Sequence, residues 1–137
     1  MGRIVAIDYG KKRTGIAVSD PLKIIATPLD TIPTRELLSF LKNYHLEEGI
    51  DDFVVGMPKN LQNNDTDSTP YVRAFINLLE KEFSGVPVHQ VDERFTSKMA
   101  FQSMIDGGMK KSERRKKGNV DKLSATLILQ SFLQSKI

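Results

Sequence analysis

Residues 5–20 read VAIDYGKKRTGIAVSD and form the motif from which the fold can be built up. The apolar residues 4–7 predict a buried strand, and residues 15–18 predict its antiparallel partner across the turn YGKKRT. Asp8 ends the first of these strands and is followed closely by Gly10. An aspartate at this point either shapes the turn or belongs to a chemical site at the tip of the strand.

Beyond this hairpin, apolar residues recur with strand or helix spacing along the chain. A third strand is expected over residues 23–31, with Pro28 at a sheet edge or a bulge. Thr34 is expected to cap the following helix. The buried stripe of that helix is predicted to hold Leu37, Leu38, Leu41 and Leu46. The later elements are predicted as a strand over 52–56, a helix over 70–84, a strand over 86–93, a helix over 95–105 and a helix over 120–133.

This order of elements predicts an α/β fold in a single domain over residues 1–137. Three strands in close succession indicate an antiparallel meander, and the alternating helices and strands after them indicate parallel crossovers. The result is a mixed five-stranded sheet with helices on both faces. Ligands of such sheets bind at the carboxyl ends of the strands.

Composition excludes several classes of function. The chain has no cysteine, so it has no disulfide, thiolate nucleophile or cysteine zinc site, and a reducing cytoplasm is expected. No apolar run approaches the length of a membrane helix, and the amino-terminal residues lack the layout of a signal peptide. The net charge is +3, yet the run KKSERRKK alone carries six basic residues and one acid. This run within residues 107–119 is either a solvated loop or an arm that binds a polyanion.

Acidic residues fall at the expected strand ends and at the start of the last helix. Asp8 follows the first strand, Asp92 and Glu93 follow the last one, and Asp121 opens the final helix. Neighbours on a strand point to opposite faces, so only one of Asp92 and Glu93 can face Asp8. Each acid alone fits a turn, an ion pair or a helix-dipole contact. Three together would bind a divalent cation such as Mg²⁺ or Mn²⁺.

Four segments, IDYGKKRTGIAVSD, VVGMPKNL, VDERFTSKMA and NVDKLSATLILQSFL, resemble the YqgF family, also called RuvX. Members are RuvC-like proteins with the ribonuclease H fold. The resemblance implies a cytoplasmic, metal-dependent nuclease that matures the 5′ end of pre-16S ribosomal RNA. It also implies that Asp8, Glu93 and Asp121 are catalytic and bind two Mg²⁺ or Mn²⁺ ions, with Asp8 bridging them.

Other residues near these motifs are expected to contact the nucleic acid. Gly10 and Gly15 would let a phosphate approach the backbone, and Lys12 and Arg13 would clamp it, unless they are merely exposed turn charges. Amides and cations of the later segments suit sugar or phosphate contacts. These residues are Lys59, Asn60, Asn64, Arg94, Thr96, Lys110, Lys111, Arg114, Arg115, Lys116 and Lys117.

Two alternatives remain open, and a third is disfavoured. A Holliday-junction resolvase acting on branched DNA would be expected to form a two-fold dimer, whereas a monomer is slightly favoured here. A nucleic-acid-binding module without catalysis would not need the three acids. A sugar-kinase-like ATPase shares the opening motif but is disfavoured, because such enzymes bind nucleotide between two copies of the fold and 137 residues are expected to supply only one. His45 and His89 are isolated in the sequence and are not expected to bind a metal.

Overall fold

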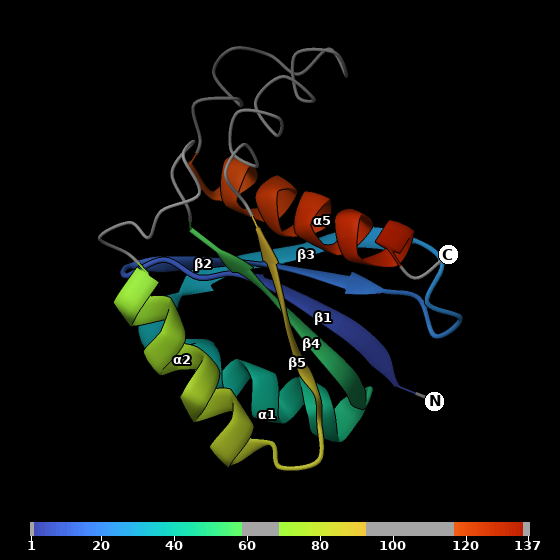
Figure 1. Ribbon diagram of the computed structural model, residues 1–137, viewed down its shortest axis with the longest axis horizontal. Helices are drawn as coiled ribbons and strands as arrows, with labels where there is room; N and C mark the ends of the chain where they lie inside the picture. The colour runs from blue at the N-terminus through green and yellow to red at the C-terminus, as the bar shows by residue number, and fades with distance from the viewer. Residues whose placement is uncertain (1, 59–68, 93–116, 136–137) are drawn as a thin grey trace.

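The computed structural model describes residues 2–58, 69–92 and 117–135 and shows a five-stranded sheet with helices on both faces (Figure 1). The strands are β1 (Arg3–Asp8), β2 (Arg13–Ser19), β3 (Ala26–Pro33), β4 (Ile50–Met57) and β5 (Val88–Asp92). Within the described residues, the helices are the 3-10 helix η1 (Thr34–Glu36), α1 (Leu37–Glu47), α2 (Thr69–Glu82) and α5 (Lys117–Ser135). The helix predicted over 95–105 lies outside these residues. Within these residues, no helix is long and apolar enough to span a membrane.

The sheet is mixed, as the sequence predicts, with the strand order β3-β2-β1-β4-β5. The first three strands pair antiparallel, whereas β4 pairs parallel with β1 and with β5. Pro28 lies on the edge strand β3, where the register with β2 shifts between Ile16 and Ala17. Both expectations for this proline, an edge and a bulge, are therefore confirmed.

Alternate residues of the central strands pack into two separate cores. On one face, Val5 and Ile7 belong to the core that α1 and α2 complete. On the other face, Ile4 and Ala6 belong to the core that α5 covers, with the helix lying across the sheet (Figure 1). This alternation follows from the two-residue period of a strand. It fixes the face toward which each later residue of β1 points.

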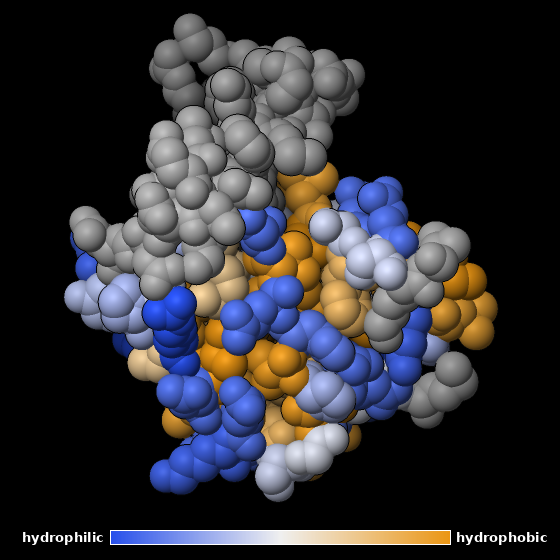
Figure 2. Space-filling view, in the orientation of Figure 1, coloured by the Kyte–Doolittle hydropathy of each residue, from blue (hydrophilic) through white to orange (hydrophobic). Residues whose placement is uncertain are grey.

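The edge strand β5 is less completely covered than the central strands. Its apolar residues Val88 and Val91 are only partly buried, each against a different core. Figure 2 shows apolar side chains reaching the surface in the middle of this face, over β5. The fully buried core therefore lies between β1, β2 and β4.

Two predictions about the first helix are wrong. Thr34 does not cap α1, which begins at Leu37 after the 3-10 turn; its hydroxyl instead donates to the carbonyl of Gly10. Leu46 is 84% exposed. It lies about two and a half helical turns after Leu37 and hence on the opposite side of the helix. The leucine spacing therefore placed one residue on the wrong side.

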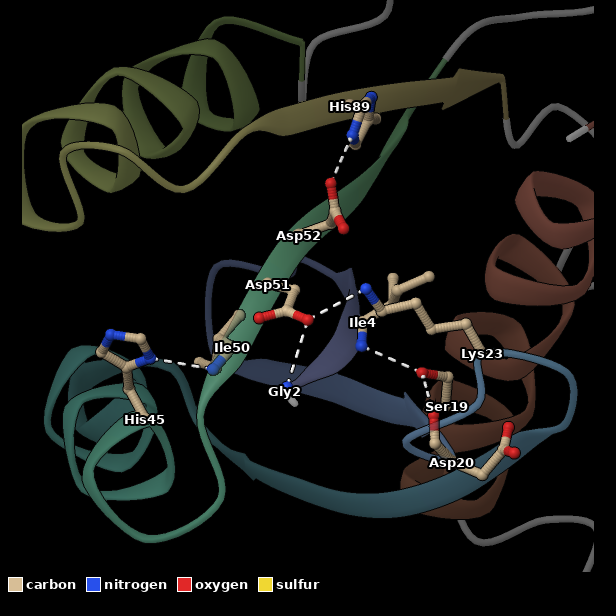
Figure 3. Close-up of polar contacts among 10 residues, drawn as sticks. All are labelled: Gly2, Ile4, Ser19, Asp20, Lys23, His45, Ile50, Asp51, Asp52 and His89. Atoms are coloured by element: carbon tan, nitrogen blue, oxygen red, sulfur yellow. Dashed lines mark hydrogen bonds and ion pairs between the residues drawn. The ribbon is translucent and has the colours of Figure 1, made fainter.

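Polar contacts fix the end of the sheet that lies away from the carboxyl ends of β1, β4 and β5 (Figure 3). Lys23 Nζ lies 2.9 Å from Asp51 Oδ2, and this contact lowers the pKa of Asp51 and raises that of Lys23. Asp51 also accepts the amide of Gly2. Both histidines are engaged here: His45 Nδ1 accepts the Ile50 amide, and His89 pairs with Asp52 at 3.0 Å.

The loop between β2 and β3 is organised by Asp20, whose Oδ1 accepts the amides of Ile25 and Ile24 at 2.8 and 2.7 Å. These amides lower the pKa of Asp20. Their contribution is thus present above the ordinary carboxyl pKa and is lost as the pH falls through the lowered value. Asp20→Ala should speed hydrogen exchange at both amides about 10-fold at neutral pH. Asp20→Asn, which keeps an acceptor, is the control; equal protection in wild type and Asp20→Ala would contradict this role.

Candidate active site

Asp8 lies at the carboxyl end of β1, on the face covered by α5. Ile4 and Ala6 pack against α5, and Asp8 is two residues further along the same strand. Residues two apart on a strand point to the same side. Asp8 pairs across the antiparallel ladder with Gly15 of β2, which therefore also faces α5.

Gly15 is the point at which the helix meets the sheet. A Cβ built on Gly15 would overlap the backbone carbonyl group of Asp121 in α5. Only glycine permits so close an approach of strand and helix. Because Asp8 is paired with Gly15, two of the three acids predicted for the site are brought to the same side of the β1–β2 ladder. They come from residues 113 positions apart in the chain.

Asp121 lies in the second turn of α5 rather than at its first residue, because the helix begins at Lys117. Its carboxylate is partly exposed and forms an ion pair with Arg13, with Nε 3.5 Å from Oδ2. Arg13 and Asp121 therefore lie on the same face of the hairpin, where their side chains pair. The sequence predicts Arg13 as a phosphate clamp; in the structure, this side chain also contacts a predicted metal ligand.

The hairpin turn and Asp121 enclose an open cleft of about 360 Å³. Its lining, within the part of the chain that the structure describes, is Gly10, Lys11, Lys12, Arg13 and Asp121. Three positively charged side chains thus surround a concave surface beside the Asp121 carboxylate. This arrangement suits the binding of a phosphate next to a site for a metal ion. The space at the Cβ position of Gly10 is filled by the carbonyl of Arg13. Both glycines therefore relieve contacts within the protein, and the approach of a phosphate to Gly10, which lines the cleft, stays a prediction.

Sequence reasoning missed Lys11 and Tyr71 as neighbours of this cleft. Lys11 Nζ lies 4.0 Å from the centre of the Tyr71 ring, at the start of α2, and the tyrosine is 49% exposed. Lys11 could have been inferred from its place beside Lys12 in the same turn. No local signal indicates Tyr71, because its contact with the hairpin depends on how α2 packs against the sheet.

The structure distinguishes Asp92 from the acids of the cleft. Asp92 pairs with Met57, which belongs to the core under α1 and α2. Asp92 therefore points away from the face of Asp8. Other predicted site residues lie outside the described residues or, for Lys117, have a side chain that is not described. They are Lys59, Asn60, Asn64, Glu93, Arg94, Thr96, Lys110, Lys111, Arg114, Arg115, Lys116 and Lys117.

Across residues 2–58, 69–92 and 117–135, no three acids or histidines form a group that could hold a metal ion. The described pair, Asp8 and Asp121, supplies two carboxylates on one face. Both engage other parts of the protein, and Asp121 does so through Arg13. Carboxylate oxygens suit Mg²⁺ or Mn²⁺, so the donor type of this pair fits the predicted ions.

A family model described as "RuvX: Holliday junction resolvase" matches residues 2–135. The chain belongs to the RuvX family. Among RuvX relatives, proteins named "Putative pre-16S rRNA nuclease" from Phocaeicola vulgatus and Christiangramia forsetii are 51% and 50% identical. The matches cover 99% and 97% of this chain and 98% of each relative. The Thermus thermophilus RuvC structure in complex with a Holliday junction superposes with a TM-score of 0.56 at 18% identity. The superposition covers 99% of this chain and 96% of the RuvC chain, and it confirms the predicted fold.

Proposed function

We propose that this RuvX chain is a metal-dependent endonuclease that hydrolyses phosphodiester bonds and matures the 5′ end of pre-16S ribosomal RNA in the cytoplasm. One observation carries the proposal: Asp8 and Asp121 both lie next to Gly15 on the α5 face of the sheet, and Asp121 lines a cleft together with Lys11, Lys12 and Arg13. The choice of RNA rests on the names of relatives about half identical to the chain over nearly its whole length.

Asp8, Glu93 and Asp121 are the residues proposed to hold two Mg²⁺ or Mn²⁺ ions. Asp8 and Asp121 share the α5 face of the sheet. Asp92 is unsuited to this role because it points to the other face, which leaves Glu93 as the proposed third carboxylate. When bound by these residues, two such ions would supply an activated water and stabilisation of the leaving oxygen of a phosphodiester.

The cations of the hairpin are proposed to bind the phosphates on either side of the cleaved bond. Lys11, Lys12 and Arg13 lie around the cleft and are open to solvent, so a phosphate can reach them. Arg13 can pair with a phosphate bidentately while it stays near Asp121. Five further predicted residues are proposed to contact the sugar-phosphate backbone of the nucleic acid away from the cleaved bond. They are Lys59, Asn60, Asn64, Arg94 and Thr96.

A second candidate is Holliday-junction resolution, which the family description favours. The same acids and cleft would serve either substrate, because both reactions hydrolyse a phosphodiester. Paired symmetric cuts require a two-fold dimer, whereas RNA maturation is consistent with a monomer. Purified protein with Mn²⁺ should cut a ribosomal RNA precursor near the 5′ end of 16S and leave a four-way junction intact. Symmetric cutting of the junction alone would favour the second candidate.

The basic run within residues 107–119 is expected to supply salt-sensitive, sequence-independent binding of the RNA backbone. Replacing Arg114, Arg115, Lys116 and Lys117 by glutamine should weaken binding and flatten its salt dependence. The slope of log Kd against log salt should fall by about 0.7 for each phosphate that the variant no longer neutralises. Fluorescence anisotropy from low to moderate salt measures it. A variant with Lys42 and Lys81 replaced, both exposed on α1 and α2, is the control. An unchanged slope in the fourfold variant would contradict this role.

A further inference from the structure

The hairpin turn that follows Asp8 is fixed from the side of the sheet opposite the cleft. Thr34, the first residue of η1, makes three contacts there. Its hydroxyl donates to the carbonyl of Gly10 at 2.5 Å, and its amide donates to the carbonyl of Lys12 at 2.9 Å. Its hydroxyl oxygen also lies 2.9 Å from that of Thr14. One residue outside the hairpin therefore binds the turn at two carbonyls and β2 at a side chain.

The directions of these hydrogen bonds follow from hydroxyl chemistry. A hydroxyl carries one hydrogen, which Thr34 uses toward Gly10, so Thr14 must be the donor in the bond between the two threonines. Thr14 is fully buried. A buried hydroxyl without a partner is costly, so Thr14 depends on Thr34. The two threonines and the Gly10 carbonyl thus form a single chain of hydrogen bonds.

This chain lies behind the cleft rather than in it. Gly15 faces α5, and Thr14, its neighbour on β2, faces the α1 and α2 side. Arg13, on the other side of Thr14, faces α5 and forms the ion pair with Asp121. The side chain of Arg13 therefore projects into the cleft from backbone that Thr34 holds on the opposite face.

We propose that Thr34 is a positioning residue for the substrate-binding hairpin: its hydroxyl sets the place of Lys12 and Arg13 without touching the substrate. This inference rests on the proposed function of the cleft. Loss of the hydroxyl would release the Gly10 carbonyl and Thr14 while leaving the backbone bond to Lys12 in place. The side chains of Lys12 and Arg13 would then sample more positions, and ordering them on a bound phosphate would cost more entropy.

A second contact keeps the hairpin folded when the hydroxyl is absent. The Tyr9 ring stacks on Phe75 of α2, with 4.6 Å between ring centres. Tyr9 is the residue directly after Asp8, so this contact anchors the near end of the turn. Thr34 holds the far end, from Gly10 to Thr14. A variant at Thr34 should therefore fold, keep Asp8 in place and lose order mainly around Arg13.

The test compares Thr34→Val, which keeps the shape and removes the hydroxyl, with Thr34→Ser, which keeps the hydroxyl. Thr27→Val is the matched control, because Thr27 is exposed on β3. Binding of a fluorescent single-stranded RNA is measured without divalent metal, and cleavage is measured with Mn²⁺. Thr34→Val should raise Kd and KM about 5-fold. Its kcat and half-saturating Mn²⁺ concentration should stay within about 2-fold of wild type. Thr34→Ser and Thr27→Val should match wild type.

A double-mutant cycle with Arg13→Ala shows whether Thr34 acts through Arg13. In the Arg13→Ala background, Thr34→Val should change Kd less than about 2-fold. The positioning role would be overturned if the fold-changes in Kd of Thr34→Val and Arg13→Ala simply multiplied in the double variant. It would also be overturned if Thr34→Val bound RNA as wild type does, or if Thr34→Ser failed to restore binding. A wild type that binds RNA but never cuts would refute the nuclease proposal, while the Kd series would still decide the role of Thr34. A wild type that binds no RNA would overturn both.

Discussion

Asp8→Asn is expected to reduce Mn²⁺-dependent cleavage by about 1000-fold or more, with little loss of stability. Asparagine has the size of aspartate and leaves the backbone pairing of β1 with β2 and β4 intact. It removes the negative charge with which Asp8 is proposed to hold a divalent cation. The loss should therefore appear in kcat, and adding more Mn²⁺ should not restore it.

Asp92→Asn is the matched control for this variant. It is the same substitution at the carboxyl end of another strand, but Asp92 points to the face under α1 and α2. Its cleavage rate should stay within about 2-fold of wild type. Single-turnover assays on the RNA precursor, together with thermal unfolding, measure both variants. If Asp8→Asn cuts as well as wild type, or if Asp92→Asn loses equal activity, the assignment of the acids fails.

Gly15→Ala is expected to lower the free energy of unfolding by about 3 kcal/mol or more. The added methyl would overlap the carbonyl group of Asp121, and both sides of the clash are backbone. Neither β2, which is paired on both edges, nor α5 can move without breaking other packing. Relief of the clash would move Asp121 of α5 away from Gly15 and Asp8 on the β1–β2 ladder. Cleavage by the folded fraction should therefore fall as well.

Gly85→Ala separates this steric effect from the general loss of a glycine. A Cβ at Gly85 meets nothing within 4 Å, but the residue has φ +92°. Its replacement should lower the free energy of unfolding by about 1 kcal/mol, from backbone conformation alone. Urea unfolding measures both variants and the wild type. Equal destabilisation by the two replacements would show that the contact between Gly15 and Asp121 is not tight.

Local apolar patterns were sufficient to predict the sheet. The runs in β1, β2 and β4 are buried on both sides, which made their strands readable, and Pro28 identified the edge strand. The same patterns failed for Leu46, because four leucines in a short segment do not all fall on one side of a helix. The prediction for Thr34 is wrong because a threonine before a helix commonly caps that helix, whereas the hydroxyl of Thr34 donates to the carbonyl of Gly10, 24 residues earlier.

The site was only partly predictable for a similar reason. A charge at the end of a buried strand is unusual and makes Asp8 a candidate in the sequence, and its role as a metal ligand stays a prediction that the resemblance implies. The residues of β5 alternate too irregularly to distinguish Asp92 from Glu93. The register of β5 against β4 shows that Asp92 faces away. The contact between Gly15 and Asp121 joins distant parts of the chain, so no local pattern contains it. Lys11 over Tyr71 is a contact of the same kind.

Asp8, Glu93 and Asp121 are proposed to bind the metal ions that support cleavage, and anomalous diffraction from crystals soaked in Mn²⁺ would locate those ions. We expect manganese peaks within coordination distance of the Asp8 and Asp121 carboxylates, about 2.0–2.3 Å. These peaks should disappear in crystals of Asp8→Asn. Manganese bound only elsewhere, or peaks that persist in Asp8→Asn, would contradict the assignment of these acids as metal ligands.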